Sequence, residues 1–130
     1  MKSTPKEYSG YGLSLLFGVT WHLGRQMVWS VTKNPIRGND GQLWVKADDL
    51  FRVMGAPVNW REDDRYKVDS ITQEISRIVY DTREVAEILH TTKENVRSMI
   101  RSGELPGAKM YVKYFVLKPV FDSIIETMDH

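Results

Sequence analysis

The stretch from residue 81 to residue 106 constrains the fold more than any other part of the chain, because it encodes two short helices with almost nothing between them. Asp81-Thr82-Arg83-Glu84 predicts a helix start with Thr82 as the N-cap, and the apolar residues that follow have helical spacing. A second helix start comes at Thr92. Gly103 predicts the end of that helix, and Leu105-Pro106-Gly107 predicts a turn away from it. The segment therefore indicates the order helix, turn, helix.

The second of these helices has two different faces. Val96, Met99 and Ile100 recur at the spacing of a buried stripe. The polar residues fall on the other face, namely Lys93, Asn95, Arg97, Ser98 and Arg101. We therefore expect a helix with a cationic outer face, and its use for binding requires that these side chains are not held by the protein's own acids.

The chain continues past this helix with a hairpin and a third helix. Residues 109–111 and 114–117 are two β-prone runs close enough to pair. Pro119 suits the first turn of a helix, and the buried stripe of that helix is Val120, Phe121, Ile124 and Ile125.

The first part of the chain predicts a fainter version of the same order. Ser9 and Thr20 are placed to cap two consecutive helices. Residues 36–37 and 42–45 predict a hairpin, in which both Gly38 and Gly41 are expected to supply positive φ. A helix with acids in its first turn is predicted from Ala47.

An internal duplication would explain the repeated order. An offset of 73 residues aligns Ser9 with Thr82 and Met27 with Ile100, and an offset of 71 aligns Val45 with Val116. We therefore predict two units, residues 1–56 and 81–130, joined by residues 57–80. In this connector Ile71, Ile75, Ile78 and Val79 predict one face of a helix.

Composition excludes several kinds of chemistry. The 130 residues contain no cysteine and three scattered histidines, so neither a thiolate site nor a metal site is expected, and we expect no cofactor and no enzymatic activity. The sequence has no run of 18 apolar residues and no apolar stretch typical of a signal peptide, which favours a cytoplasmic protein without membrane contact.

Charge is unevenly distributed although the net charge is only +1. Residues 20–46 carry a net charge of +3 and residues 91–118 carry +4, so the remaining residues carry −6. Two basic segments on an acidic body are typical of a protein that binds a polyanion such as nucleic acid.

The run from Asp81 to Pro106 closely resembles the excisionase-like and MerR-like winged helix-turn-helix family, in the pattern T-x-E-V-A-x-x-L followed by V-x-x-x-I-x-x-G-x-L-P. The resemblance covers about 45 residues when the hairpin and the last helix are included. Together with the internal duplication, it implies an α+β fold of two winged helix-turn-helix units with small antiparallel hairpins, fused with pseudo-two-fold symmetry as an internal dimer. A chain with two such units also resembles the small DNA-binding regulators of the TraN type, which are encoded in conjugative-transfer operons of Gram-positive plasmids.

The resemblance also implies which residues touch DNA. The outer face of the helix after Thr92 takes the recognition role, through Lys93, Asn95, Arg97, Ser98 and Arg101, and the hairpin contributes Lys109, Tyr111 and Lys113. The corresponding positions of the first unit are Thr20, His22, Arg25, Gln26, Arg37 and Asn39. Arg, Asn and Gln suit this role because they present paired donors or acceptors to base edges. Met110-Tyr111-Val112-Lys113-Tyr114 departs from the glycine-rich, arginine-bearing hairpin of the family, which leaves the groove contact of the hairpin open.

Tryptophans and a run of acids have a second interpretation. Trp21, Trp29, Trp44 and Trp60 could form a stacking platform for single strands. The apolar neighbours of Trp29 and Trp44 favour packing in the core instead. Trp21 could touch a DNA sugar or methyl group, but packing is the preferred interpretation. Glu62-Asp63-Asp64 could belong to a metal-dependent nuclease, but three successive carboxylates cannot converge on one site from regular structure, which favours a solvated turn.

The sequence thus predicts a monomeric, sequence-specific double-stranded-DNA-binding regulator, either a transcriptional repressor or an accessory factor at a transfer origin. An excisionase-like architectural bender is a close alternative. A protein-interaction module of a secretion or recombination machine, with Trp21, Met27 and Trp29 in contact with conjugation or recombination proteins, is the alternative from another class.

Overall fold

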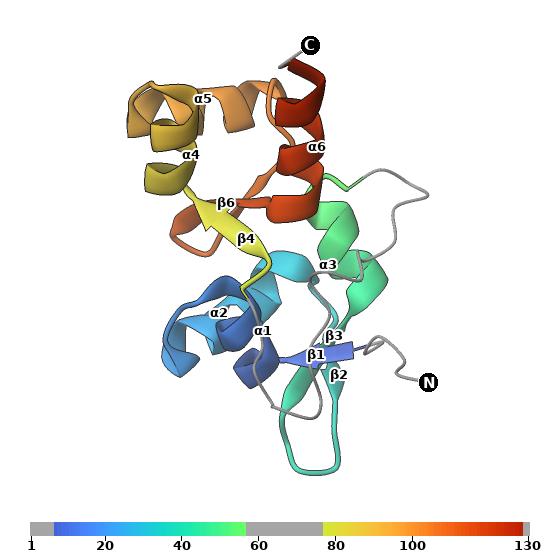
Figure 1. Cartoon of the computed structure of the whole chain (residues 1–130). Helices are drawn as coiled ribbons and strands as arrows, with labels where there is room; N and C mark the ends of the chain where they lie inside the picture. The colour runs from blue at the N-terminus through green and yellow to red at the C-terminus, as the bar shows by residue number, and fades with distance from the viewer. Residues whose placement is uncertain (1–6, 57–76, 129–130) are drawn as a thin grey trace, which may run out of the picture.

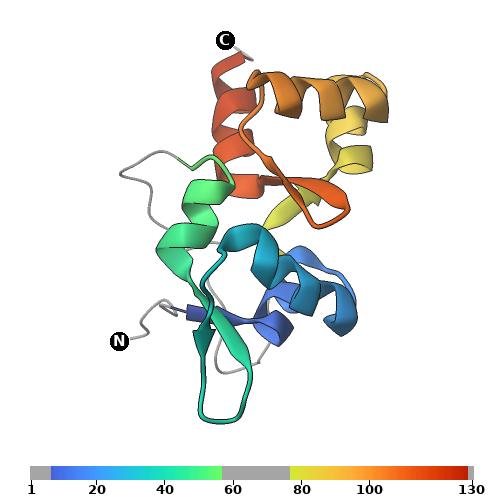
Figure 2. The same cartoon turned by 180° about the vertical axis from the view of Figure 1, so that it is seen from behind.

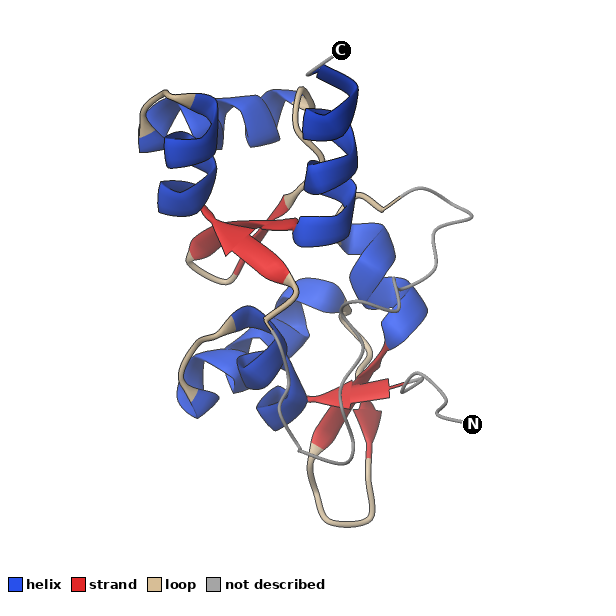
Figure 3. Cartoon of the chain, in the orientation of Figure 1, coloured by secondary structure: helices blue, strands red, loops and turns tan. Residues whose placement is uncertain are grey.

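Two small antiparallel sheets, each accompanied by three helices, make up the described part of the computed structural model, which covers residues 7–56 and 77–128 (Figures 1 and 3). We refer to residues 7–56 as the first half and to residues 77–128 as the second half. The fold class is α+β, as expected from the sequence.

The same order of elements occurs in both halves. The first half contains β1 (Glu7–Ser9), α1 (Gly10–Phe17), α2 (Trp21–Val31), β2 (Ile36–Arg37), β3 (Leu43–Lys46) and α3 (Ala47–Val53). The second half contains β4 (Val79–Asp81), α4 (Thr82–Leu89), α5 (Lys93–Ser102), β5 (Ala108–Met110), β6 (Lys113–Leu117) and α6 (Lys118–Met128). The sheets have the orders β1-β3-β2 and β4-β6-β5, so the strand before the last helix is central in each.

Side-chain caps fix where the helix pairs begin. Ser9, Thr20 and Thr92 cap α1, α2 and α5 through their hydroxyl oxygens, as the sequence predicted. The cap of α4 is Asp81 rather than Thr82: its carboxylate accepts from the Glu84 backbone N–H, and the Glu84 carboxylate accepts from the Asp81 N–H. The paired caps are therefore Ser9 with Asp81 and Thr20 with Thr92, an offset of 72 residues instead of the expected 73.

The first strand of each sheet was not expected. Tyr8 in β1 pairs with Val45, and Tyr80 in β4 pairs with Val116, so each strand meets a partner more than 30 residues away. Val79 therefore lies in a strand and Ile78 outside any helix, which corrects that end of the predicted connecting helix. The rest of that prediction, the acidic run at 62–64 and Trp60 lie outside the described residues.

The two glycines of the β2–β3 hairpin serve different purposes. Gly41 has φ +82°, as expected for the turn. Gly38 does not have positive φ, contrary to the prediction. A Cβ at Gly38 would lie 2.9 Å from Nε1 of Trp44, so any other residue there would have to displace the indole ring.

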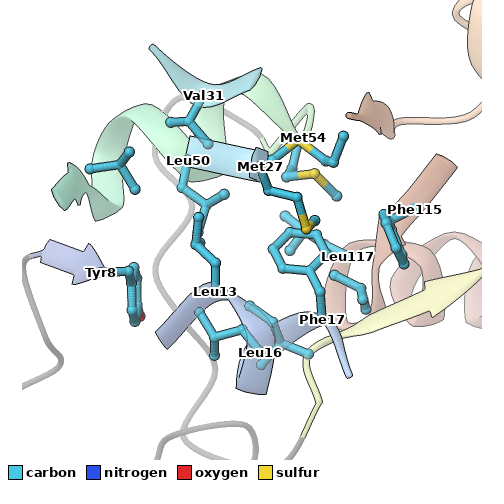
Figure 4. Packing of buried hydrophobic residues seen from close by; sticks show 14 of the residues in the cluster. Tyr8, Leu13, Leu16, Phe17, Met27, Val31, Leu50, Met54, Phe115 and Leu117 are labelled. Atoms are coloured by element: carbon cyan, nitrogen blue, oxygen red, sulfur yellow. The ribbon is translucent and has the colours of Figure 1, made fainter. Parts of the chain in front are cut away.

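The central strand β6 of the second half is buried on both faces. Phe115 and Leu117 belong to a large apolar cluster with Phe17, Met27 and other residues of the first half (Figure 4). Val116 points the other way and packs in a smaller cluster with helices of its own half. Because side chains alternate across a strand, the sheet β4-β6-β5 is a layer shared between the two halves.

Further contacts join the halves through the same sheet. The rings of Phe17 and Phe115 meet edge to face with centroids 5.0 Å apart. The Ile78 backbone N–H donates to the Leu16 carbonyl of the first half, and within the second half the Lys118 N–H donates to the Ile78 carbonyl. The backbone N–H of Tyr111, in the β5–β6 turn, donates to Oγ of Ser30 on α2 at 2.7 Å. The relative position of the halves is thus fixed by apolar and polar contacts.

These contacts do not have the expected pseudo-two-fold character. A two-fold interface joins the same surface of both partners. In this chain the sheet of the second half contacts the ends of α1 and α2 of the first half, and no equivalent contact runs from the first sheet to α4 and α5 within the described residues. The interface therefore joins unlike surfaces. The pseudo-two-fold internal dimer is not confirmed.

Candidate nucleic-acid interface

Helices α4 and α5 form a helix-turn-helix with a very short connection. Helix α4 ends at His90, which is in the left-handed conformation with φ 55°. Two residues later Thr92 caps α5, and its hydroxyl oxygen accepts from the Asn95 backbone N–H at 3.0 Å. Helix α5 ends at Gly103, also left-handed with φ +87°. Both ends of α5 are thus fixed by local backbone chemistry.

Packing against α4 fixes which face of α5 meets solvent. Val96 is fully buried and lies in one cluster with Val85 and Phe121. The opposite side carries the residues predicted for DNA contact: Lys93, Asn95, Ser98 and Arg101 are exposed and Arg97 is half-buried. The structure therefore places all five predicted side chains of this segment on one helix with an apolar inner face.

Two of these side chains are paired with an acid of the same helix, contrary to what the sequence argument required. Glu94 accepts from Nη1 of Arg97 at 3.2 Å and from Nη2 of Arg101 at 3.0 Å. The amide nitrogen of Asn95 donates to Oγ1 of Thr91 at 2.8 Å. The Glu94 side chain is 70% exposed, and solvent-exposed pairs contribute little free energy, so a DNA phosphate can replace the carboxylate.

Electrostatics at this cluster follow from the same pairs. The guanidinium groups of Arg101 and Arg97 hold the pKa of the Glu94 carboxyl below its ordinary value. Conversely, Glu94 and the hydroxyl group of Tyr114 raise the pKa of Arg101. Glu94 was not among the residues singled out from the sequence, although its spacing of three and seven residues from the two arginines could have identified it.

The β5–β6 hairpin carries the other predicted residues of the second half. Lys109 and Lys113 are exposed, and the Lys109 ammonium lies 5.9 Å from the centre of the Tyr114 ring. Tyr111 is 44% exposed and has φ 61°, so the turn itself is in the left-handed region. Because the Tyr111 N–H is bonded to Ser30, the turn lies beside α2.

In the first half the predicted contact residues lie on α2 and the β2–β3 hairpin. His22, Arg25 and Gln26 are exposed on α2, and Arg37 and Asn39 are exposed on the hairpin. Thr20 is exposed, and its hydroxyl oxygen caps α2 by accepting from the Leu23 N–H at 3.2 Å.

An aromatic hollow lies between α2 and this hairpin. Its volume is about 450 Å³, and its lining includes Tyr11, Trp21, Arg25, Trp29 and Arg37. Trp21 and Trp29 are more than half exposed, so the prediction that they pack in the core was wrong. The reason is helical spacing: Trp21, Arg25 and Trp29 are four residues apart and form one outer stripe, while Met27 and Val28 fill the core. The Arg25 guanidinium lies 4.8 Å from the centre of the Trp21 ring.

The described residues contain neither a metal-binding cluster nor a helix able to span a membrane. No group of three or more His, Cys, Asp or Glu side chains there could hold a metal ion. None of the helices in the described ranges combines the length and the apolar character needed to cross a membrane.

Comparison with known proteins agrees with the geometry of the second half. Helices α4 and α5 define the helix-turn-helix class, whose members bind DNA. Residues 79–126 match a family model described as "Helix-turn-helix domain", which spans β4 through most of α6. No curated protein and no solved structure is significantly similar to this chain. Residues 79–126 are thus similar to helix-turn-helix domains, and the geometry of α4 and α5 agrees with that similarity.

Proposed function

We propose that the protein is a sequence-specific, non-enzymatic, double-stranded-DNA-binding regulator, and that α5 is its recognition helix. One observation carries the proposal: the polar face of α5 lies opposite the buried Val96 and carries the exposed Lys93 and Arg101 together with the half-buried Arg97. An α-helix fits the major groove, and the short turn after α4 braces this helix against its neighbour.

Each of the five predicted contact residues of α5 has a role that follows from its chemistry. Arg97 and Asn95 supply the paired donors and acceptors that discriminate guanine and adenine. Lys93 and Arg101 contact phosphates on either side, and Ser98 adds a hydrogen bond to a base or a phosphate. On the β5–β6 hairpin, Lys109 and Lys113 contact the backbone next to the groove, with Tyr111 at the turn.

The regulatory consequence follows from occupancy of the DNA. A protein bound at a promoter or at a transfer origin blocks the access of polymerase or relaxase, so repression or accessory control in a mobile-element operon is the role we propose. Support for that finer role comes from the sequence resemblance alone. Footprinting on the DNA around the protein's own gene tests it: a protected promoter supports repression, and a circular-permutation assay that shows a sharp bend supports an architectural role instead.

Salt dependence tests the DNA-binding proposal itself. Each phosphate contact lowers log K by about 0.9 per unit of log salt concentration, so four to seven contacts give a slope of roughly −4 to −6. The measurement is fluorescence anisotropy with a long mixed-sequence duplex between low and moderate salt. A slope near zero, or no binding at low salt, would contradict the proposal.

A second candidate function rests on the aromatic hollow. Tyr11, Trp21 and Trp29 are exposed, and exposed aromatic residues with arginine are typical of the centre of protein interfaces. The alternative function is therefore to bind, at α2, a partner protein of a secretion or recombination machine. A Trp21→Ser/Trp29→Ser double variant with unchanged DNA affinity would favour that partner, whereas a reduced DNA affinity would place both side chains at the DNA.

A further inference from the structure

The contacts between the halves determine how two helix pairs would be presented to one ligand. The sheet of the second half covers the ends of α1 and α2, and the β5–β6 turn is bonded to α2 through Tyr111 and Ser30. A Cβ on Gly55, just after α3, would lie 3.2 Å from the backbone nitrogen of Gly107, so the end of α3 also abuts the loop before β5. All three contacts join the helix ends of one half to the sheet side of the other.

The two halves also face the same way. In Figure 1 the helix pair of each half lies on the left, its third helix lies on the right, and its hairpin lies below the helix pair. The view from behind brings α5, the β5–β6 hairpin, α2 and the β2–β3 hairpin to the near side, one after the other from top to bottom (Figure 2). The order is therefore helix, hairpin, helix, hairpin.

We propose that both halves bind one DNA duplex head to tail, so that the target consists of two tandem subsites in the same orientation rather than an inverted repeat. The inference rests on the proposed DNA binding through α5 and extends it to α2 and the class of DNA site. A single chain occupies both subsites, because both surfaces belong to one rigidly connected molecule.

The form of the double helix supports this arrangement. One face of B-DNA presents major and minor grooves in alternation, with one full turn in roughly 34 Å. A head-to-tail protein presents helix and hairpin in the same alternation, so each helix meets a major groove and each hairpin meets the minor groove beside it. The hydrogen bond from Tyr111 to Ser30 holds the hairpin of the second half directly beside α2, which is where a minor groove separates two major grooves.

The two subsites must differ in sequence. On α5 the outer face carries Lys93, Arg97 and Arg101, whereas on α2 it carries Trp21, Arg25 and Gln26. Trp21 and Trp29 suit apolar contact with thymine methyl groups and sugars, and Arg25 and Gln26 suit base edges. Orientation therefore cannot be judged from the DNA sequence and has to be mapped on the complex.

The absence of cysteine from the sequence permits such a map. Four single-cysteine variants of the full chain carry an iron–EDTA cleavage reagent: Ser98→Cys on α5, Val112→Cys in the β5–β6 turn, His22→Cys on α2 and Asn39→Cys in the β2–β3 turn. All four positions are exposed. The DNA is a duplex that the unmodified protein has selected from a random pool, and the protein is present at saturating concentration.

The expected result is four cleavage centres in the order 98, 112, 22, 39 along the duplex, each displaced from the next by roughly half a helical turn, or about 5 base pairs. A mirror-symmetric order, with both hairpin probes between the two helix probes or outside them, would overturn the inference. Cleavage from positions 98 and 112 only would also overturn the inference. In that case α2 would be free to bind a protein partner, and the proposed function would still stand. Failure of the unmodified protein to select any duplex would reject the proposed function itself.

Discussion

At the scale of single residues, Glu94 governs the charge that α5 presents to DNA. Its carboxylate holds two guanidinium groups and would face the phosphates that approach α5. We expect Glu94→Gln to raise the affinity for duplexes of any sequence by roughly two- to fivefold, because one repelling charge is lost and both arginines are released. Fluorescence anisotropy measures this, with Glu87→Gln on α4 as the control, since Glu87 is equally exposed and pairs only distantly with Arg83.

The pH dependence of this gain follows from the pKa of Glu94. Because the arginines depress that pKa in the folded protein, the charged pairs are present above the unfolded pKa and are lost only as pH falls through the folded value. The carboxylate is thus ionised throughout the neutral range, and the gain from Glu94→Gln should be the same at about pH 6 and about pH 8. A loss of affinity in the variant would mean that Glu94 orients the arginines for binding.

Arg97 tests whether α5 reads bases. Arg97→Ala should reduce affinity for a selected duplex by about 1–3 kcal/mol and relax the sequence preference at one position. Lys113→Ala, by contrast, should weaken all sequences alike, because it removes a phosphate contact only. Arg83→Ala, on the outer side of α4, is the control and should bind as the unmodified protein does. Equal losses for Arg97→Ala on selected and random duplexes would contradict base reading.

At the scale of elements, the cap of α4 controls the position of the helix pair. Asp81→Ala removes the hydrogen bond that the Asp81 carboxylate accepts from the Glu84 N–H, whereas the Asp81 backbone N–H still donates to the Glu84 carboxylate. The variant should lower the free energy of unfolding by about 0.5–2 kcal/mol. Thr82→Ala, at the position that the sequence suggested as the cap, should change the free energy of unfolding by much less. Urea denaturation followed by circular dichroism compares the two variants. A larger effect for Thr82→Ala would contradict the observed capping.

Local chemistry explains which elements could be predicted from the sequence. Three of the four helix caps, the two hairpins and the five α5 side chains follow from residue type and spacing within one segment. Strands β1 and β4 do not, because each is only three residues long and is stabilised by pairing with a strand far along the chain. The sequence argument also missed the exposure of Trp21 and Trp29. Their apolar character suggested burial, but their positions in the helix place them on its outer face.

At the scale of the whole molecule, the shared core predicts that both halves unfold together. Every tryptophan lies between residues 21 and 60, so fluorescence reports on that part of the chain alone. Phe115 lies in the second half but packs on Phe17, and Phe115→Ala should cost about 3–5 kcal/mol. Tryptophan fluorescence and far-ultraviolet circular dichroism should shift to lower urea by the same amount. A shift in circular dichroism without a shift in fluorescence would show that the halves unfold independently.

The arrangement of the two halves could not be predicted from the sequence. Apolar residues at Phe115 and Leu117 predict burial, but nothing in their local pattern says that the surface covering them belongs to the other half of the chain. The expectation of two-fold symmetry came from the likeness between the halves. Likeness fixes the fold of each half but not the surfaces through which they meet.

Charges on the outer face of the first sheet have a consequence for assembly. The pair Glu7 and Lys46 occupies the register position that Val79 and Leu117 occupy in the second sheet, and both charged residues are exposed. At the opposite end of the molecule lies Ile88, which the offset of 72 residues aligns with the buried Leu16. Ile88 is 41% exposed. The double variant Glu7→Val/Lys46→Leu should therefore let the first sheet of one molecule bind the Ile88 end of the next. Because this contact joins two unlike surfaces and does not close into a ring, it would produce open fibres. Light scattering that stays at the monomer value would show that the two charges are not what keeps each molecule from polymerising.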